Sequence, residues 1–477
     1  MKKLKKILYL LSAHERKRAI LLLGMILIMA LLDMIGVASI MPFIAVMTNP
    51  ELVETNFILK TAYETSSIIG VKNAQQFLFV LGISVFLLLI ISLSFKALTS
   101  YAQVRFTTMR EYSIAKRLVE GYLHQPYSWF LNRHSADLGK TILSEVGLIV
   151  SKGIGPMMDL ISQSTVTIAL LVLLILVDPK LTLIVALTLG SAYGLMYLFS
   201  QNLVKQIGKK RLKANEGRFT IIDEVFGAFK EVKVGGLEET YLQRFSDPAK
   251  TLADQSAKLS IISQLPRFAL EAIAFGGIVL VVLYLISQSG SIINVMPVIA
   301  LYALAGYRLM PALQKIYISL TELRVVSPSL NAIYNDLTNL QTTSKKTNKD
   351  VLHFDRSINL KNIYYHYPNA SRTALKNINL TIPARSTIGL VGATGSGKTT
   401  TVDIILSLLE PQKGSIEVDN IVINKFNSKA WQNFIGYVPQ EIFLSDDTVA
   451  ANIAFGVDPK RIDIEAVEHA AKIANLH

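Results

Sequence analysis

Residues 392–399 read GATGSGKT and place Gly392, Gly397, Lys398 and Thr399 at the defined positions of the phosphate-loop pattern G-x-x-x-x-G-K-[ST]. Glycines let successive backbone N–H groups turn toward an anion, and a following helix adds partial positive charge at its N-terminus. The lysine ammonium suits the terminal phosphates of a nucleotide, and the threonine hydroxyl suits Mg²⁺. The motif therefore predicts a site for a magnesium-bound nucleotide.

The residues on either side of this loop support the prediction. Ser386–Val391 (STIGLV) is a short β-type run that ends where the loop begins. After the loop, apolar residues recur at helical spacing through Val402, Ile405, Leu406 and Leu409. We therefore expect strand, loop and helix in that order; the alternative is a glycine-rich turn that matches by chance.

The composition of the chain indicates a membrane protein. The 477 residues are 51% hydrophobic and only 17% charged, which is too apolar for an ordinary soluble protein. A bilayer core about 30 Å thick needs roughly 20 apolar residues in a helix. Runs of about this length predict six membrane spans: Ala19–Met47, Phe77–Ala97, Met157–Val177, Leu181–Phe199, Phe268–Ile286 and Ile292–Met310.

The polar run QTTSKKTNKD at 341–350 separates the two parts and has no hydrophobic periodicity. We predict a mainly α chain with a six-helix transmembrane domain at 1–340, a linker at 341–352 and an α/β nucleotide-binding domain at 353–477.

The net charge of +13 is distributed like that of a membrane protein. Basic residues gather at 2–18, 105–117 and 205–213, whereas the segments 48–76, 178–180 and 287–291 are short or nearly neutral. By the positive-inside rule the latter are outside loops and both termini are cytoplasmic. This distribution disfavours a nucleic-acid binder, and the absence of cysteine excludes disulfides and thiolate metal sites.

Two segments that flank the phosphate loop resemble the ATP-binding-cassette family. Residues 358–382 are similar to its opening strands, which implies that Tyr367 stacks on adenine; a half-buried strand tyrosine is the alternative. Residues 434–456 (FIGYVPQEIFLSDDTVAANIAFG) are similar to its glutamine loop, which implies that Gln440 contacts Mg²⁺ and the attacking water.

The resemblance implies ATP and Mg²⁺ as cofactors. Lys398 and Gln440 are then the catalytic residues, and Thr399 and Gln440 hold the metal. The nucleotide would be bound by Tyr367 together with Gly392, Ala393, Thr394, Gly395, Ser396, Gly397, Lys398, Thr399 and Thr400.

Other parts of the family pattern are not found. No LSGGQ-like signature, strand ending in Asp-Glu or switch histidine follows Phe455, and the look-alikes at Asp178 and Asp223–Glu224 lie upstream of the phosphate loop. We therefore expect a chain truncated within the nucleotide-binding domain, an incomplete parallel core sheet with uncovered apolar faces, and no ATP hydrolysis. A catalytically inactive nucleotide-binding membrane protein is one alternative function.

The membrane part resembles the type-I exporters of this family, and more narrowly the flippases of polyprenyl-pyrophosphate-linked oligosaccharides, through residues 35–56, 264–277 and 300–316. The resemblance implies a homodimeric half-transporter in the bacterial inner membrane, surrounded by lipid. A generic lipid, peptide or drug exporter is the alternative. Residues 126–142 and 215–233 are similar to the coupling helices of these exporters.

Three cations lie in or beside predicted spans: Lys96, Arg267 and Arg308. A charge at a helix centre costs about 2.5–3.5 kcal/mol on insertion scales, so it is seldom kept without a role. We predict that these cations bind the anionic headgroup of the substrate. The alternatives are that Lys96 and Arg267 extend to the membrane interface, or that Arg308 pairs with Asp33 or Glu271.

Overall fold

The computed structural model describes residues 2–69, 71–131, 133, 135–289, 292–340, 354–368, 370, 372–440 and 442–476. The chain divides into two compact units. The first unit comprises Met1–Gln125 and Trp129–Thr343, and the second comprises Pro126–Ser128 and Ser344–His477. Each unit is described separately.

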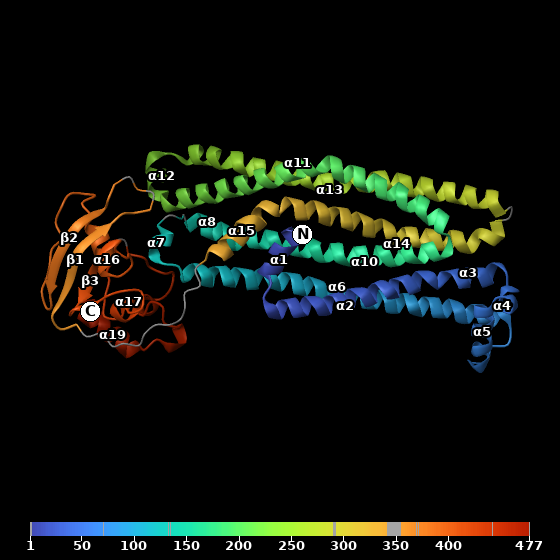
Figure 1. The fold of residues 1–477 in the computed structure, drawn as a ribbon, viewed down its shortest axis with the longest axis horizontal. Helices are drawn as coiled ribbons and strands as arrows, with labels where there is room; N and C mark the ends of the chain where they lie inside the picture. Colours follow the sequence, from blue (N-terminus) through green and yellow to red (C-terminus); the bar gives the residue numbers. More distant parts are fainter. Residues whose placement is uncertain are drawn as a thin grey trace. The chain divides into compact units, whose positions relative to one another are not determined.

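The described part of the first unit is helical, and its long helices lie side by side (Figure 1). They are α2 (Ala13–Ala38), α6 (Ala74–Leu123), α10 (Gly155–Val177), α11 (Pro179–Gly227), α13 (Glu238–Ser289) and α14 (Ile292–Val325). The short helix α3 (Ile40–Thr48) follows α2 directly after Ser39. Within the described residues, five segments are long and apolar enough to cross a membrane: Ala13–Thr48, Ala74–Leu123, Asp137–Val177, Pro179–Gly227 and Met296–Val325. The remaining predicted span, Phe268–Ile286, lies in α13. Most side chains of this span fall outside the described residues.

Local signals explain where two of these helices begin. Ser12 and Glu15 form a capping box at the start of α2, in which each side chain accepts a hydrogen bond from the other's backbone N–H. The Asp178 carboxylate accepts from the N–H of Leu181 at 3.1 Å, and Pro179 occupies the first turn of α11. Asp178 therefore separates two apolar runs that are adjacent in the sequence.

Three of the long helices have more than twice the length needed to cross a bilayer core about 30 Å thick. Helices α6, α11 and α13 contain 50, 49 and 52 residues, or roughly 75 Å each at about 1.5 Å per residue. Shorter elements complete the unit: α1 (Lys2–Leu10), α4 (Leu52–Thr55), α5 (Phe57–Ser66), η1 (Ser67–Ile69), α8 (Ser135–Lys140), η2 (Thr141–Glu145), α9 (Val146–Ile149), η3 (Val150–Ile154), α12 (Phe229–Gly235) and α15 (Ser327–Asn339). Helix α7 (Tyr127–Phe130) is divided between the two units after Ser128.

The second unit contains a four-stranded antiparallel sheet with the order β2-β1-β3-β4. Its strands are β1 (Ser357–Tyr365), β2 (Leu375–Pro383), β3 (Lys413–Val418) and β4 (Ile421–Val422). The helical elements are α16 (Lys398–Ile405), α17 (Ser428–Gln432), α18 (Val449–Ile453), η4 (Pro459–Arg461) and α19 (Ile464–Ile473). Ile363, Ile404, Val418 and Trp431 are buried together and join the sheet to α16 and α17.

The β3–β4 hairpin turns at Asp419 and Asn420, which have φ values of 46° and 68°. This left-handed pair is the geometry of a two-residue hairpin turn, and Asp and Asn tolerate it well. The Asp419 carboxylate accepts hydrogen bonds from the backbone N–H groups of Asp355, Arg356 and Ser357. These bonds fix the start of β1 beside the hairpin.

The strand predicted at Ser386–Val391 is absent from the described structure, where this segment runs without strand pairing. A strand needs a neighbour to satisfy its backbone N–H and C=O groups, and no described segment lies in register beside this one. The local sequence has β propensity, but β propensity alone does not provide a neighbouring strand. Val391 is consequently 97% exposed.

Candidate functional site

The phosphate loop of the second unit has the backbone that its glycines predict. Gly395 and Gly397 adopt φ values of 80° and 93°, in the left-handed region that favours glycine. A Cβ at Gly397 would lie 2.6 Å from Leu375 Cδ2 and 2.9 Å from the carbonyl oxygen of Ala374, whereas a Cβ at Gly395 would meet open space. Gly395 is therefore favoured by its backbone angle alone, whereas Gly397 is favoured by its backbone angle and by the lack of space for a Cβ.

Helix α16 begins at Lys398, directly after the loop. It ends at Ile405, before the predicted limit at Leu409, because Ser407 turns to a φ of 54°. Two side chains of α17 donate hydrogen bonds to carbonyl oxygens at this end. Trp431 Nε1 donates to the oxygen of Ile405 at 2.7 Å, and Gln432 Nε2 donates to that of Leu406 at 3.1 Å. These bonds satisfy groups that a helix end leaves unpaired.

The Lys398 ammonium folds back over the loop. Its Nζ donates to the carbonyl oxygens of Gly392 at 2.7 Å and Ala393 at 2.9 Å. The neighbouring Thr399 is exposed. Lys398 and Thr399 thus lie at the N-terminus of α16, where helix polarity favours an anion.

Tyr367 and Thr400 are brought together by the fold. The Tyr367 hydroxyl and Thr400 Oγ1 are 3.0 Å apart and hydrogen-bonded. Thr400 is buried in α16, and Tyr367 lies two residues after β1. The sequence indicated both residues separately, but nothing in it predicted the bond between them. One turn further along α16, burial raises the pKa of the Asp403 carboxyl.

Gln440 is not linked to this group by a hydrogen bond between described residues. It is exposed in an irregular segment. The metal and water contacts inferred for Gln440 stay predictions.

A second candidate site lies among the helices of the first unit. The Asp33 side chain on α2 is only 1% exposed and carries two cations. Arg308 Nη1 from α14 lies 3.0 Å from Asp33 Oδ1, and Lys96 Nζ from α6 lies 3.4 Å from Oδ2. Ser92 Oγ donates to Oδ1 at 3.0 Å. The sequence indicated Asp33 as one alternative partner of Arg308, but no sequence signal indicated Ser92.

The third predicted substrate cation does not join this cluster. Arg267 Nε lies 2.8 Å from Glu271 Oε1 one turn along the same helix, and the Arg267 side chain is 58% exposed. Its charge is therefore balanced locally on α13. The structure brings together Lys96 and Arg308 but not Arg267.

Neighbouring ion pairs along α14 have equal numbers of positive and negative groups. Lys315 Nζ lies 2.9 Å from Asp159 Oδ2 on α10, and Glu322 Oε1 lies 2.5 Å from Lys152 Nζ on η3. In contrast, Lys96 and Arg308 share one carboxylate. Among these three clusters in the described residues, only the one at Asp33 carries an excess positive charge.

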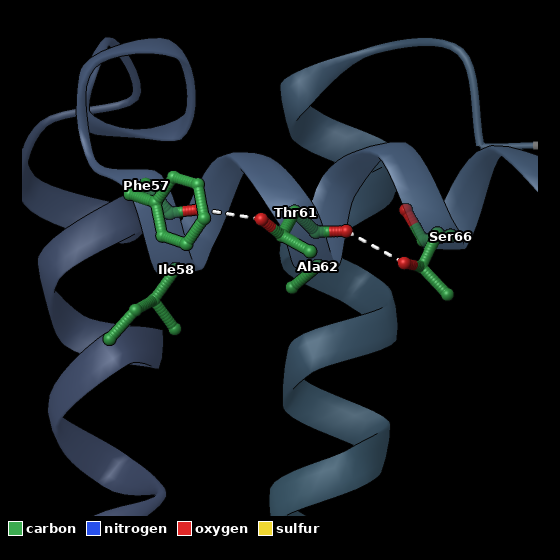
Figure 2. A pocket seen from close by; sticks show the side chains of 6 residues that line it. Phe57, Ile58, Thr61, Ala62 and Ser66 are labelled. Carbon is green, nitrogen blue, oxygen red and sulfur yellow. Dashed lines mark hydrogen bonds between the residues drawn. The ribbon is translucent and has the colours of Figure 1, made fainter.

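An apolar hollow of about 550 Å³ lies on α5, along Phe57, Ile58, Ala62 and Ser66 (Figure 2). Thr61 Oγ1 donates to the carbonyl oxygen of Phe57 at 2.8 Å, so this hydroxyl is used within the helix. On the inner side of α5, Leu59 packs against residues of α3 and α6. The hollow therefore offers mainly apolar surface.

Comparison with known families places both units in one group of proteins. The family described as "ABC transporter transmembrane region" matches residues 55–312, more than half of the chain. The family described as "ABC transporter" matches residues 375–477. The first match covers most of the long helices, and the second includes the phosphate loop.

Individual relatives agree with these matches. An ATP-dependent lipid A-core flippase of Cupriavidus metallidurans is 26% identical over 368 residues, covering 76% of this chain and 60% of the relative. A protein of the same name from Wigglesworthia glossinidia brevipalpis is 26% identical over 350 residues, covering 72% of this chain and 59% of the relative. The chain thus spans about 60% of the length of these relatives.

The fold is also that of a solved exporter. The structure of a bacterial Atm1-family ABC exporter with ATP bound has a TM-score of 0.71 and 17% sequence identity, and the alignment covers 97% of this chain and 78% of that one. At this identity the likeness establishes the fold alone. The helical unit, the phosphate-loop unit and the family matches together identify the chain as a multi-pass membrane protein that belongs to the ABC transporter family.

Proposed function

We propose that the full-length transporter to which this chain belongs uses ATP to export or flip a lipid-linked oligosaccharide across the bacterial inner membrane, as one half of a homodimer. The excess positive charge of Lys96 and Arg308 over Asp33 is the observation that carries this proposal, because it suits an anionic headgroup. Relatives named for lipid A-core, a lipid-linked saccharide, support this class of cargo. In this proposal residues 1–340 form the transmembrane domain, 341–352 the linker and 353–477 the nucleotide-binding part.

In the nucleotide site, the backbone of Gly392–Gly397 would surround the phosphates, and Lys398 would exchange its carbonyl contacts for β- and γ-phosphate oxygens. Thr399 would ligate Mg²⁺, with Gln440 as the second contact to the metal and the water. Tyr367 would stack on adenine. Its bond to Thr400 would hold the ring beside the loop. Replacing Lys398 by alanine should abolish ATP binding while leaving the fold intact.

The cargo site is tested by comparing two ion pairs on α14. Arg308→Gln removes a cation from the cluster with excess charge, and Lys315→Gln removes one from a neutral pair. A charge-assisted contact contributes about 1.5–3 kcal/mol, so Arg308→Gln should weaken binding of a fluorescent polyprenyl-pyrophosphate glycan by about 10- to 100-fold. Lys315→Gln should lower the melting temperature without this loss.

Unchanged glycan binding in Arg308→Gln would reject an anionic headgroup and favour export of an uncharged lipid, peptide or drug. Equal losses of binding in both variants would assign a structural role to Arg308. The proposed topology is tested separately with single cysteines. Cysteine at Thr55 should react with an impermeant reagent applied outside intact cells, and cysteine at Thr343 should not.

A further inference from the structure

The cluster on α2, α6 and α14 already contains an anion, the buried carboxylate of Asp33. Both of its oxygens are used: Oδ1 receives Arg308 Nη1 and Ser92 Oγ, and Oδ2 receives Lys96 Nζ. A phosphate that binds these cations must therefore share or displace contacts that Asp33 holds. It also meets the like charge of Asp33 at short range, which opposes its entry.

The two cations differ in how open they are to a ligand. The Lys96 side chain is 37% exposed, whereas that of Arg308 is 14% exposed. An ammonium has three N–H donors, and Lys96 uses one of them on Asp33. An incoming anion would reach Lys96 first and Arg308 only by competing with the carboxylate.

We propose that Asp33 is a specificity-determining residue: it is an internal counter-anion that excludes lipid headgroups with a single negative charge and admits pyrophosphates. This inference rests on the proposed function and specifies its substrate class. A phosphodiester with one charge can contact the spare donors of Lys96, but it brings no more charge than the carboxylate with which it competes for Arg308. A pyrophosphate carries two or more charges and can engage both cations.

This role solves a problem that any such site meets in a membrane. Anionic phospholipids surround the protein in large excess over a rare lipid-linked substrate, and two unopposed cations would attract them. Specificity against an abundant competitor often requires a repulsive element as well as an attractive one. Asp33 supplies the repulsion, and Ser92 stabilises the carboxylate in its buried position.

The inference is tested with variants that change the charge of the cluster. Taking Asp33, Lys96 and Arg308 together, the formal charge is +1 in the wild type, +2 in Asp33→Asn, 0 in Lys96→Gln and +1 in the double variant that combines Asp33→Asn with Lys96→Gln. All proteins would carry Lys398→Ala, so that the phosphate loop does not bind the probe. The full chain would be placed in phosphatidylcholine nanodiscs, and the dissociation constant of farnesyl pyrophosphate measured with and without phosphatidylglycerol.

We expect Asp33→Asn to bind farnesyl pyrophosphate about tenfold more tightly and Lys96→Gln about tenfold more weakly. Phosphatidylglycerol should leave the wild type unaffected but compete strongly in Asp33→Asn. The double variant should keep an affinity near that of the wild type and yet lose the discrimination against phosphatidylglycerol. Because it restores the original charge, the double variant carries the test if Asp33→Asn does not fold.

Weaker or unchanged pyrophosphate binding in Asp33→Asn would overturn the inference, as would equal competition by phosphatidylglycerol with and without Asp33. If Lys96→Gln and Arg308→Gln both bind the probe normally, the proposed headgroup site itself is wrong, which is a distinguishable result. Inorganic pyrophosphate is the control for the source of the anion. It should bind more weakly than the farnesyl ester, and equal affinity would refute a lipid headgroup.

Discussion

The two left-handed glycines of the phosphate loop provide a matched test of how this loop is built. Alanine in the left-handed region costs roughly 1–2 kcal/mol through the clash of its Cβ with its own backbone. Gly395→Ala should cost only this amount, because its Cβ would meet open space. Gly397→Ala adds the contact at 2.6 Å with Leu375 Cδ2 and the one at 2.9 Å with the carbonyl oxygen of Ala374.

Overpacking of this kind costs typically 1–3 kcal/mol more, because a backbone carbonyl cannot move aside as a flexible side chain does. Gly397→Ala should therefore cost about 2–5 kcal/mol in total. If nucleotide binding requires the undistorted loop, Gly395→Ala should weaken binding of a fluorescent ATP analogue about 5- to 30-fold, and Gly397→Ala more than about 30-fold. The assay is a fluorescence titration of the full chain, with the melting temperature as a control for folding. Equal affinities for the two variants would refute this account of the loop.

Two further predictions concern hydrogen bonds of the second unit. Thr400→Val and Tyr367→Phe should each lower the free energy of unfolding by about 0.5–1.5 kcal/mol, because each breaks the hydrogen bond between these two side chains. Since the bond is the same, the double variant should lose no more than about one such contribution. Additive losses in thermal melts would contradict this. Hydrogen bonds from the N–H groups of Asp355, Ser357 and Arg356 lower the pKa of the Asp419 carboxyl. This carboxylate therefore stabilises the fold above about pH 4, which is the usual pKa of aspartate. The stabilisation is lost as the pH falls through the lower pKa of the folded state. Hydrogen exchange should therefore show protection of these amides that decreases in acid in the wild type but not in Asp419→Asn.

The phosphate loop was predictable from the sequence because its determinants are local. The glycines are required by backbone angles within the loop itself, and Gly395 and Gly397 have the positive φ values that glycine favours. The end of the following helix was not predictable in the same way. Its last carbonyls are satisfied by Trp431 and Gln432, which lie more than twenty positions further along the chain.

The segment Ser386–Val391 shows the limit of β propensity. Its residues are typical of a strand, but a strand is defined by hydrogen bonds to a neighbour, and among the described residues none pairs with it. Where the register partner is near in sequence, as in the β3–β4 hairpin, the turn residues Asp419 and Asn420 fix the pairing. Local composition can indicate an extended segment, but pairing depends on where the rest of the chain lies.

The membrane cations illustrate the same limit for charge. Hydropathy identifies Lys96, Arg267 and Arg308 equally, since each interrupts or borders an apolar run. Their surroundings differ because helix packing determines which carboxylate each one meets. Arg267 finds Glu271 on its own helix, and its charge is cancelled there. Lys96 and Arg308 converge from different helices on Asp33, and one carboxylate cannot balance both. The attraction of this cluster for an anion therefore depends on the ratio of cations to carboxylates, and that ratio is fixed by the packing of α2, α6 and α14, which the spacing of the apolar runs does not specify.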